Sequence, residues 1–138
     1  MNYFVDTNVF LRFLIKEDPQ THQECADLLE LVKKEELEIY ISSIILAEIA
    51  WMLRSFYDQP KSKRIKALKA IAGLKKVKFL EEFNPLLAIN LFQNNKVKFV
   101  DALVASIIRG QDENWTIISY DDDFDKLGVV RKEPSEII

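Results

Sequence analysis

The amino-acid sequence predicts an α/β fold, with a short central parallel sheet of four to five strands sandwiched by helices. Short apolar runs of strand length alternate with longer segments whose apolar residues recur at helical spacing. No internal repeat and no linker-like run interrupts the 138 residues. We therefore expect a single domain over residues 1–138.

Strand signals are short runs rich in β-branched and aromatic residues. In chain order they occupy residues 3–5, 38–41, 77–80 and 115–119. A further edge strand is expected at residues 128–130. Because helical segments separate the strands, neighbouring strands are expected to run parallel.

Helix signals lie between the strands and place apolar residues on one stripe. In chain order they occupy residues 9–15, 19–34, 44–57, 61–72, 85–94 and 100–109. Asp18, before a proline, marks one N-terminus, while Gly73 and Gly110 follow two C-termini, where a left-handed residue commonly ends a helix. The segment 44–57 is apolar on nearly every side, so we expect it to be largely buried, with Trp51 in the core.

Composition limits the possible functions and partners. The net charge is -3 and the pI is about 5.3, so any affinity for nucleic acid must come from a local patch. Residues 61–78 contain eight Lys and Arg and no acid, which we interpret as a solvated helix face, with a phosphate-facing rim as the alternative. The single cysteine and the absence of signal-peptide and membrane-spanning patterns predict a cytoplasmic protein.

Missing motifs exclude several classes of enzyme. The chain has three glycines and neither a P-loop nor a dinucleotide fingerprint, which excludes enzymes with nucleotide cofactors. The only histidine, His22, is expected at the surface, so a Ser-His-Asp triad is not expected. Cys25 is expected to be a core thiol, and one His with one Cys cannot build the usual zinc site.

Four acidic positions stand out from this background. Three carboxylates stand alone inside apolar runs, namely Asp6, Glu48 and Asp101, and an acidic cluster at 121–123 follows the last apolar strand. An ionised carboxylate among apolar side chains loses hydration that only hydrogen bonds, a countercharge or a metal ion can replace. Arg12 is the only basic residue in these runs. An external cation is therefore the simplest compensation.

We expect these acids to converge. Asp6 and Asp121 follow the C-terminal ends of strands, where α/β sheets form their ligand crevice, and Glu48 and Asp101 lie near the N-termini of helices. Oxygen ligands of this kind favour Mg²⁺ or Mn²⁺. Each acid also has an ordinary alternative: a helix cap or an ion pair with Arg12 for Asp6, a helix-dipole interaction for Asp101, a solvated turn for Asp121 and a polar stripe for Glu48.

Each acid also stands in a short motif. The motifs are Phe4-Val5-Asp6-Thr7-Asn8-Val9, Ile45-Leu46-Ala47-Glu48-Ile49-Ala50-Trp51, Phe99-Val100-Asp101-Ala102 and Ile118-Ser119-Tyr120-Asp121-Asp122-Asp123-Phe124. In content and order they resemble the motifs of PIN-domain ribonucleases of the VapC toxin type, and the resemblance covers essentially the whole chain.

The resemblance implies a Mg²⁺- or Mn²⁺-dependent endoribonuclease, a hydrolase of RNA phosphodiester bonds that is the toxin of a toxin–antitoxin pair. It implies a catalytic quartet of Asp6, Glu48, Asp101 and Asp121, in which Asp6 and Asp101 bind the metal directly. The supporting residues that it implies are Thr7, Asn8, Ser119, which stands where the family often has Thr, and Asp123, which is an alternative fourth acid. The implied partners are RNA, an antitoxin protein and a second copy of the chain, with no membrane.

Two alternative functions stay open at this point. A phosphohydrolase of the haloacid-dehalogenase kind also has an Asp after its first strand, but it requires a second Asp at the position of Asn8. A non-catalytic RNA-binding or scaffolding protein of the same fold is expected to lack at least one acid of the quartet, and all four are present.

Overall fold

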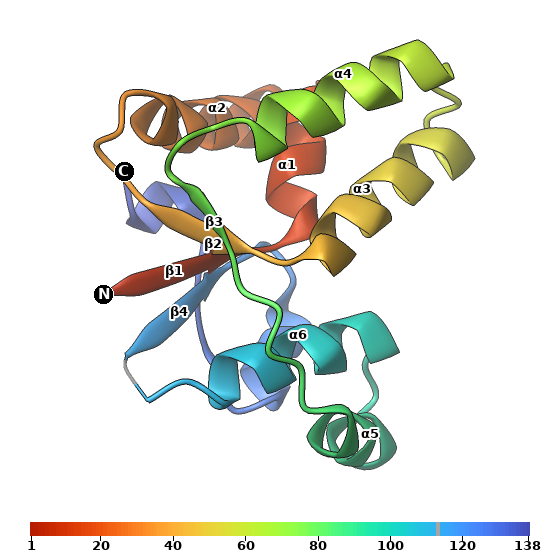
Figure 1. Ribbon diagram of the computed structural model, residues 1–138, viewed down its shortest axis with the longest axis vertical. Helices are drawn as coiled ribbons and strands as arrows, with labels where there is room; N and C mark the ends of the chain where they lie inside the picture. The colour runs from red at the N-terminus through yellow and green to blue at the C-terminus, as the bar shows by residue number, and fades with distance from the viewer. Residues whose placement is uncertain (113) are drawn as a thin grey trace.

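The computed structural model describes residues 1–112 and 114–138 and has a five-stranded parallel sheet at its centre (Figure 1). The strands are β1 (Asn2–Val5), β2 (Ile39–Ile41), β3 (Val77–Phe79), β4 (Trp115–Ile118) and β5 (Val130–Lys132). Their order in the sheet is β3-β2-β1-β4-β5, and every neighbouring pair is parallel. The predicted α/β class and parallel sheet are confirmed, although β5 begins two residues later than predicted.

In the described part of the chain, six α-helices flank the sheet. They are α1 (Thr7–Leu14), α2 (Pro19–Lys33), α3 (Ser43–Ser55), α4 (Lys61–Ala72), α5 (Pro85–Asn94) and α6 (Phe99–Arg109). Figure 1 shows α1 to α4 on one side of the sheet and α5 with α6 on the other. Two short 3-10 helices, η1 (Asp122–Lys126) and η2 (Pro134–Glu136), lie on either side of β5 in the sequence.

The two central strands β1 and β4 determine where a site can form. Val5 lies opposite Ile118, and both side chains are fully buried. Strands buried on both faces are nearly continuous apolar runs, which is why these two were recognisable in the sequence. The backbone N–H of Asp6 donates to the carbonyl of Ile118 at 3.0 Å. The residues that follow β1 and β4 therefore emerge side by side at one edge of the sheet.

Helix α3 is less buried than predicted. Its buried residues are Ile45, Ile49 and Leu53. Trp51 is 58% exposed and packs edge-on against the exposed ring of Phe56, with 5.8 Å between the ring centroids. The prediction that this helix is largely buried, with Trp51 in the core, is wrong. A helix on the outside of a sheet buries one stripe, and apolar residues on its other faces stay exposed.

The glycines at helix ends also differ from expectation. Gly73 and Gly110 have φ angles of -84° and -79°, so the predicted left-handed conformation is wrong at both positions. A side chain at position 73 is instead disfavoured by a steric clash, since a Cβ there would lie 2.8 Å from the carbonyl oxygen of Lys69. Gly128 does adopt the left-handed region, with φ of 73°.

Other sequence-based expectations concern single residues and the membrane. Cys25 is fully buried, as predicted, and His22 is partly exposed, with its ring stacked on Phe13. Within residues 1–112 and 114–138, none of the helices combines the length and the hydropathy that a membrane crossing requires.

Candidate metal centre

The four acids of the predicted quartet line one pocket of about 80 Å³ at the edge of the sheet where β1 and β4 end. Asp6 precedes α1, Glu48 lies in the second turn of α3, Asp101 lies in the first turn of α6, and Asp121 follows β4. The other residues that line the pocket are Thr7, Asn8, Leu11, Met52 and Lys98. Side chains from three helices and from the ends of two strands therefore meet in one small space.

Asp6 is buried and fixed by hydrogen bonds to both of its oxygens. Oδ1 accepts from the backbone N–H of Thr7 at 2.8 Å, which caps α1. Oδ2 accepts from Ser119 Oγ at 2.7 Å and from Asn8 Nδ2 at 3.1 Å. Burial raises the pKa of Asp6 to about 6, because the loss of hydration outweighs the hydrogen bonds, which lower it. Asp6 is therefore well oriented but costly to ionise without a cation.

Asp101 is buried and has an oxygen without a partner. Among the described residues, two buried side-chain atoms lack a hydrogen bond, Asp101 Oδ2 and Ser42 Oγ. Loss of hydration and then the charge of Asp6 raise the pKa of Asp101 well above its ordinary value, although Lys98 opposes this. A buried carboxylate oxygen with no donor costs free energy that a bound cation would recover.

Glu48 is half-buried and is turned toward the pocket by a contact from α1. The hydroxyl of Thr7 donates to Glu48 Oε1. Helix α3, which carries Glu48, is in turn capped by a residue far away in sequence. The backbone N–H of Ser43 donates to Glu81 Oε1 at 2.6 Å, and its hydroxyl donates to the other oxygen of Glu81. Ser42 is the N-cap residue of α3, but its side chain makes no capping hydrogen bond.

The fourth acid is flanked by a second candidate, as the sequence indicated. In the described chain, the acids that could hold one ion together are Asp101, Asp121 and Asp123, with one oxygen of each within 4.8 Å of the others. Asp121 lines the acid pocket with Asp6, whereas Asp123 does not and is paired with Lys126 at 3.1 Å. Asp6 is outside this group of three, although it lines the same pocket as Asp101 and Asp121.

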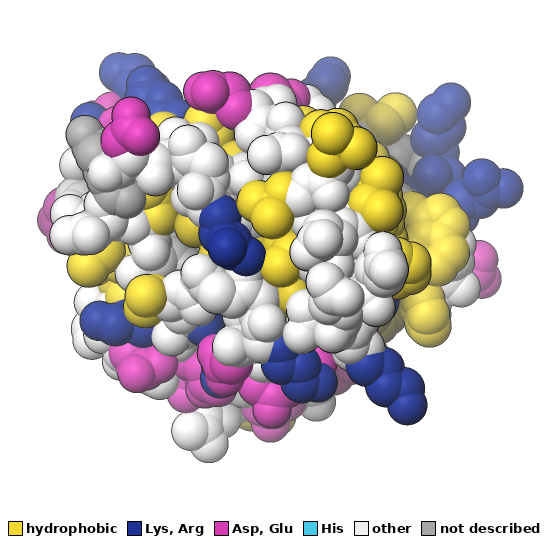
Figure 2. All heavy atoms as spheres, turned by 90° about the horizontal axis from the view of Figure 1, so that it is seen from below, with side chains coloured by type: hydrophobic (Ala, Val, Ile, Leu, Met, Phe, Trp, Pro, Cys, Tyr) yellow, Lys and Arg dark blue, Asp and Glu magenta, His cyan; other side chains and the backbone are white. Residues whose placement is uncertain are grey.

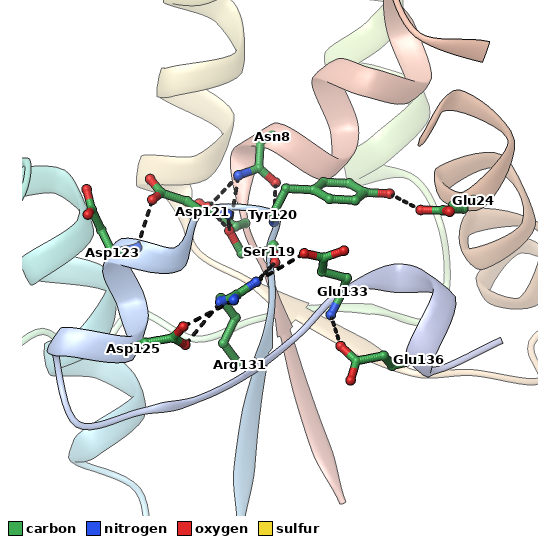
Figure 3. A network of polar contacts seen from close by, with 11 residues as sticks. Asn8, Glu24, Ser119, Tyr120, Asp121, Asp123, Asp125, Arg131, Glu133 and Glu136 are labelled. Atoms are coloured by element: carbon green, nitrogen blue, oxygen red, sulfur yellow. Dashed lines mark hydrogen bonds and ion pairs between the residues drawn. The ribbon is translucent and has the colours of Figure 1, made fainter. Parts of the chain in front are cut away.

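Ser119 connects the acids to one another (Figure 3). Its side chain is fully buried, and its Oγ donates to Asp6 while accepting from Asn8 Nδ2 and from the backbone N–H of Asp121, both at 3.0 Å. Asn8 Oδ1 accepts from the backbone N–H of Tyr120 at 3.3 Å. The end of β4 is thus tied to the start of α1 by two side chains that the sequence indicated as supporting residues.

Arg131 on β5 supports Ser119 from the other side and was not predicted. Its Nη1 donates to the carbonyl of Ser119 at 3.2 Å, and its Nε and Nη2 bind both oxygens of Asp125 at 3.0 and 3.1 Å (Figure 3). Nη1 also lies 3.4 Å from Glu133 Oε2. A bidentate guanidinium of this kind fixes both position and angle. Arg131 therefore joins the end of β4, η1 and the chain after β5.

Arg12 does not neutralise Asp6, which removes one alternative for that acid. Its Nη1 donates to Thr21 Oγ1 at 3.2 Å, and its Cζ lies 4.5 Å from the ring centroid of Tyr120. The hydroxyl of Tyr120 donates to Glu24 at 2.8 Å. In the described chain, none of the four quartet acids forms an ion pair with Lys or Arg. Hydrogen bonds compensate Asp6 and Glu48, whereas Asp101 has a buried oxygen without a donor and only the more distant charge of Lys98 to favour its ionised form.

The donor set fits a hard divalent cation. Carboxylate and hydroxyl oxygens surround the pocket, and neither His nor Cys lines it. The unpartnered Asp101 Oδ2 and the three clustered acids, Asp101, Asp121 and Asp123, are the features that could accept a metal.

The model of the PIN domain family matches residues 3–130 of the chain. The chain belongs to the PIN domain family. A comparison of this PIN domain with curated proteins gives no match.

Three solved structures share the fold of this chain. VapC20 from Mycobacterium tuberculosis, described as a Sarcin-Ricin loop cleaving toxin, has a TM-score of 0.67 and 19% identity over 94% of this PIN domain and 97% of that chain. VapBC2 from Rickettsia felis, in a structure with a DNA fragment from the VapBC2 promoter, has a TM-score of 0.66 and 20% identity over 96% of this chain and 98% of that chain. FitAcB from Neisseria gonorrhoeae has a TM-score of 0.63 and 17% identity over 96% of this chain and 98% of that chain. These likenesses concern the fold.

Proposed function

We propose that this PIN-domain protein is a Mg²⁺- or Mn²⁺-dependent endoribonuclease and the toxin of a toxin–antitoxin pair. The observation that carries the proposal is the pocket in which four acids meet without a basic ion-pair partner, one of them, Asp101, with a buried oxygen that has no donor. The similarity in fold to VapC20, a toxin that cleaves the Sarcin-Ricin loop, supports RNA as the substrate.

We assign Asp6 and Asp101 as metal ligands, with Glu48 and Asp121 positioned to orient and deprotonate the attacking water. Asp123 is the alternative to Asp121, because its carboxylate belongs to the same oxygen cluster. A bound divalent cation lowers the pKa of water and offsets the negative charge that grows on the phosphate in the transition state.

The remaining residues of the site act by positioning. Ser119 and Asn8 fix the angle of the Asp6 carboxylate, and the Thr7 hydroxyl keeps Glu48 directed into the pocket. In the proposed hydrolysis, the oxygen of water bonds to phosphorus and a carboxylate takes the proton, while the bond from phosphorus to the 3′ oxygen breaks and that oxygen takes up a proton from solvent water. The products carry 5′-phosphate and 3′-hydroxyl ends, as the family resemblance implies.

We assign the antitoxin to two apolar hollows of about 390 and 310 Å³ along α1, α2 and α4. Leu14, Ala67 and Ala70 line both hollows, and Lys63 and Lys66 stand at the first. An amphipathic segment with acidic residues beside its apolar stripe would match this surface. We also propose that the protein forms a homodimer, as the family resemblance implies.

The test is cleavage of labelled RNA by the purified protein. We expect cleavage with Mg²⁺ or Mn²⁺, none after excess chelator, and none with Asp6→Asn even when metal is present. Asp112→Asn is the matched control, because Asp112 is an exposed aspartate that does not line the pocket. Cleavage that survives both chelation and Asp6→Asn in a clean preparation would refute the proposal.

A further inference from the structure

We propose that an open hollow beside the acid pocket binds one nucleotide of the RNA strand next to the scissile phosphate. The hollow measures about 380 Å³ and lies where α5 ends and α6 begins. It is lined by Phe92, Asn95, Lys96, Val97, Lys98 and Asp123. This inference rests on the proposed ribonuclease function and assigns part of its substrate-binding surface.

Two residues make the hollow continuous with the acid pocket. Lys98 lines both spaces. Asp123 lines the hollow, and one of its oxygens lies within 4.8 Å of oxygens of Asp101 and Asp121. A phosphodiester chain whose reacting phosphate sits among the acids therefore has its neighbouring nucleotide within reach of this hollow.

The charges of the hollow are suited to a phosphate. Lys98 is the only basic residue that lines the acid pocket, and Lys96 is exposed beside it. In the described chain neither lysine has an ion pair, even though acids stand close by. The acid pocket repels an RNA strand, so two ammonium groups next to it are needed to offset that repulsion. The basic run 61–78 contributes no residue to the lining of either space.

The uncharged lining is suited to a base. Phe92 is 46% exposed, and its ring is supported by an edge-to-face contact with Phe99 at 5.5 Å between centroids. An exposed and supported aromatic face is a stacking surface for any base. Asn95 lines the hollow, and its Nδ2 donates to the carbonyl of Leu91 at 3.0 Å, so its Oδ1 remains available as an acceptor. Figure 2, which views the molecule from below, shows hydrophobic side chains over part of this face, basic side chains scattered around them and acidic side chains along the lower edge.

The lysines are tested by binding of single-stranded RNA in the Asp101→Asn background, which is expected not to cleave it. We expect Lys98→Met and Lys96→Met each to weaken binding up to about 5-fold and to reduce the slope of log affinity against log salt by about 0.7. Lys69→Met is the matched control, because Lys69 is an exposed lysine of the basic run on α4. Unchanged affinity and slope in both variants, or equal losses with Lys69→Met, overturn the inference.

The aromatic face is tested by Phe92→Leu, for which we expect at least about 5-fold weaker RNA binding. Phe56→Leu is its control, because Phe56 is also an exposed ring in an edge-to-face pair but lines neither the acid pocket nor the hollow. A changed oligomeric mass with unchanged RNA affinity assigns Phe92 to a protein contact and overturns its stacking role.

Cleavage assays with the same lysine and aromatic variants separate this inference from the proposed function. If the wild-type protein cleaves RNA and Lys96→Met, Lys98→Met and Phe92→Leu leave KM unchanged, the inference fails and the ribonuclease stands. If the wild-type protein cleaves no RNA with Mg²⁺ or Mn²⁺, the ribonuclease fails. The binding data in the Asp101→Asn background then still decide whether the hollow takes a nucleotide.

Discussion

Replacing Asp101 by Asn should stabilise the metal-free protein at pH 8 and remove most of the stabilisation that Mg²⁺ provides. Asp101 is buried beside Asp6, one of its oxygens has no donor, and its pKa is raised by lost hydration and by the charge of Asp6. The neutral amide has no ionisation cost and no longer repels Asp6. The same change deletes one of the oxygens proposed to bind the metal.

The expected change in the free energy of unfolding can be calculated from the pKa shift of a carboxyl group in this pocket. The pKa of Asp6 rises from 3.8 to about 6, and one pKa unit corresponds to about 1.36 kcal/mol, so ionising Asp6 in the folded state costs about 3 kcal/mol. Asp101 has the same kind of burial and an additional charged neighbour. We therefore expect Asp101→Asn to raise the free energy of unfolding by about 2 to 3 kcal/mol at pH 8 in chelator. The gain should vanish below about pH 4, where the carboxyl is protonated in both states.

The assay is urea denaturation followed by tryptophan fluorescence, in chelator and in Mg²⁺, for the wild type, Asp101→Asn and the exposed control Asp112→Asn. We expect Mg²⁺ to stabilise the wild type and the control but to have little effect on Asp101→Asn. Destabilisation of Asp101→Asn by a similar amount at every pH would refute the reasoning, because it would make Asp101 a structural hydrogen-bonding residue instead of a strained charge.

Three further predictions concern the surroundings of Asp6. Asp6 should by itself remove about 3 kcal/mol of stability from the metal-free protein as the pH rises from about 4 to above 6, because the folded state retains the Asp6 proton that the unfolded state releases; denaturation of Asp101→Asn at a series of pH values checks this without the Asp101 contribution. Ser119→Ala removes a hydrogen bond that lowers the Asp6 pKa, so Mg²⁺ binding, measured by calorimetry, should shift to higher pH, whereas Ser119→Thr should retain the wild-type midpoint. Arg131→Met should cost about 1 to 3 kcal/mol and weaken Mg²⁺ binding, with partial rescue by Arg131→Lys; unchanged Mg²⁺ affinity would limit Arg131 to the stability of the fold.

The acids could be predicted because their signal is local. An acid isolated in an apolar run, such as Asp6 or Glu48, is visible without knowledge of the fold. The position of Asp6 at the end of a strand then predicted its place at the edge of the sheet, and the structure brings it to the same pocket as Asp101. The parallel sheet was predictable for the same reason, since alternating apolar runs specify it directly.

Arg131, Glu81 and the exposure of Trp51 could not be predicted from local patterns. Arg131 reaches Ser119 only because β5 pairs in parallel with β4, and Glu81 caps α3 only because β3 pairs in parallel with β2. A charged residue in a polar segment gives no indication of such a distant partner. Trp51 was misassigned because hydrophobicity alone does not reveal which faces of a helix other elements cover.

The pairing of β1 with β4 also affects when the protein becomes competent during its synthesis. β1 leaves the ribosome first, yet Asp6 is joined by Ser119 and Asp121 only after β4 has been translated and has docked beside it (Figure 1). A nascent chain or a fragment that ends before residue 115 contains no complete acid pocket. Under the proposed function, such a chain cuts no RNA, so activity has to await the pairing of β4 with β1.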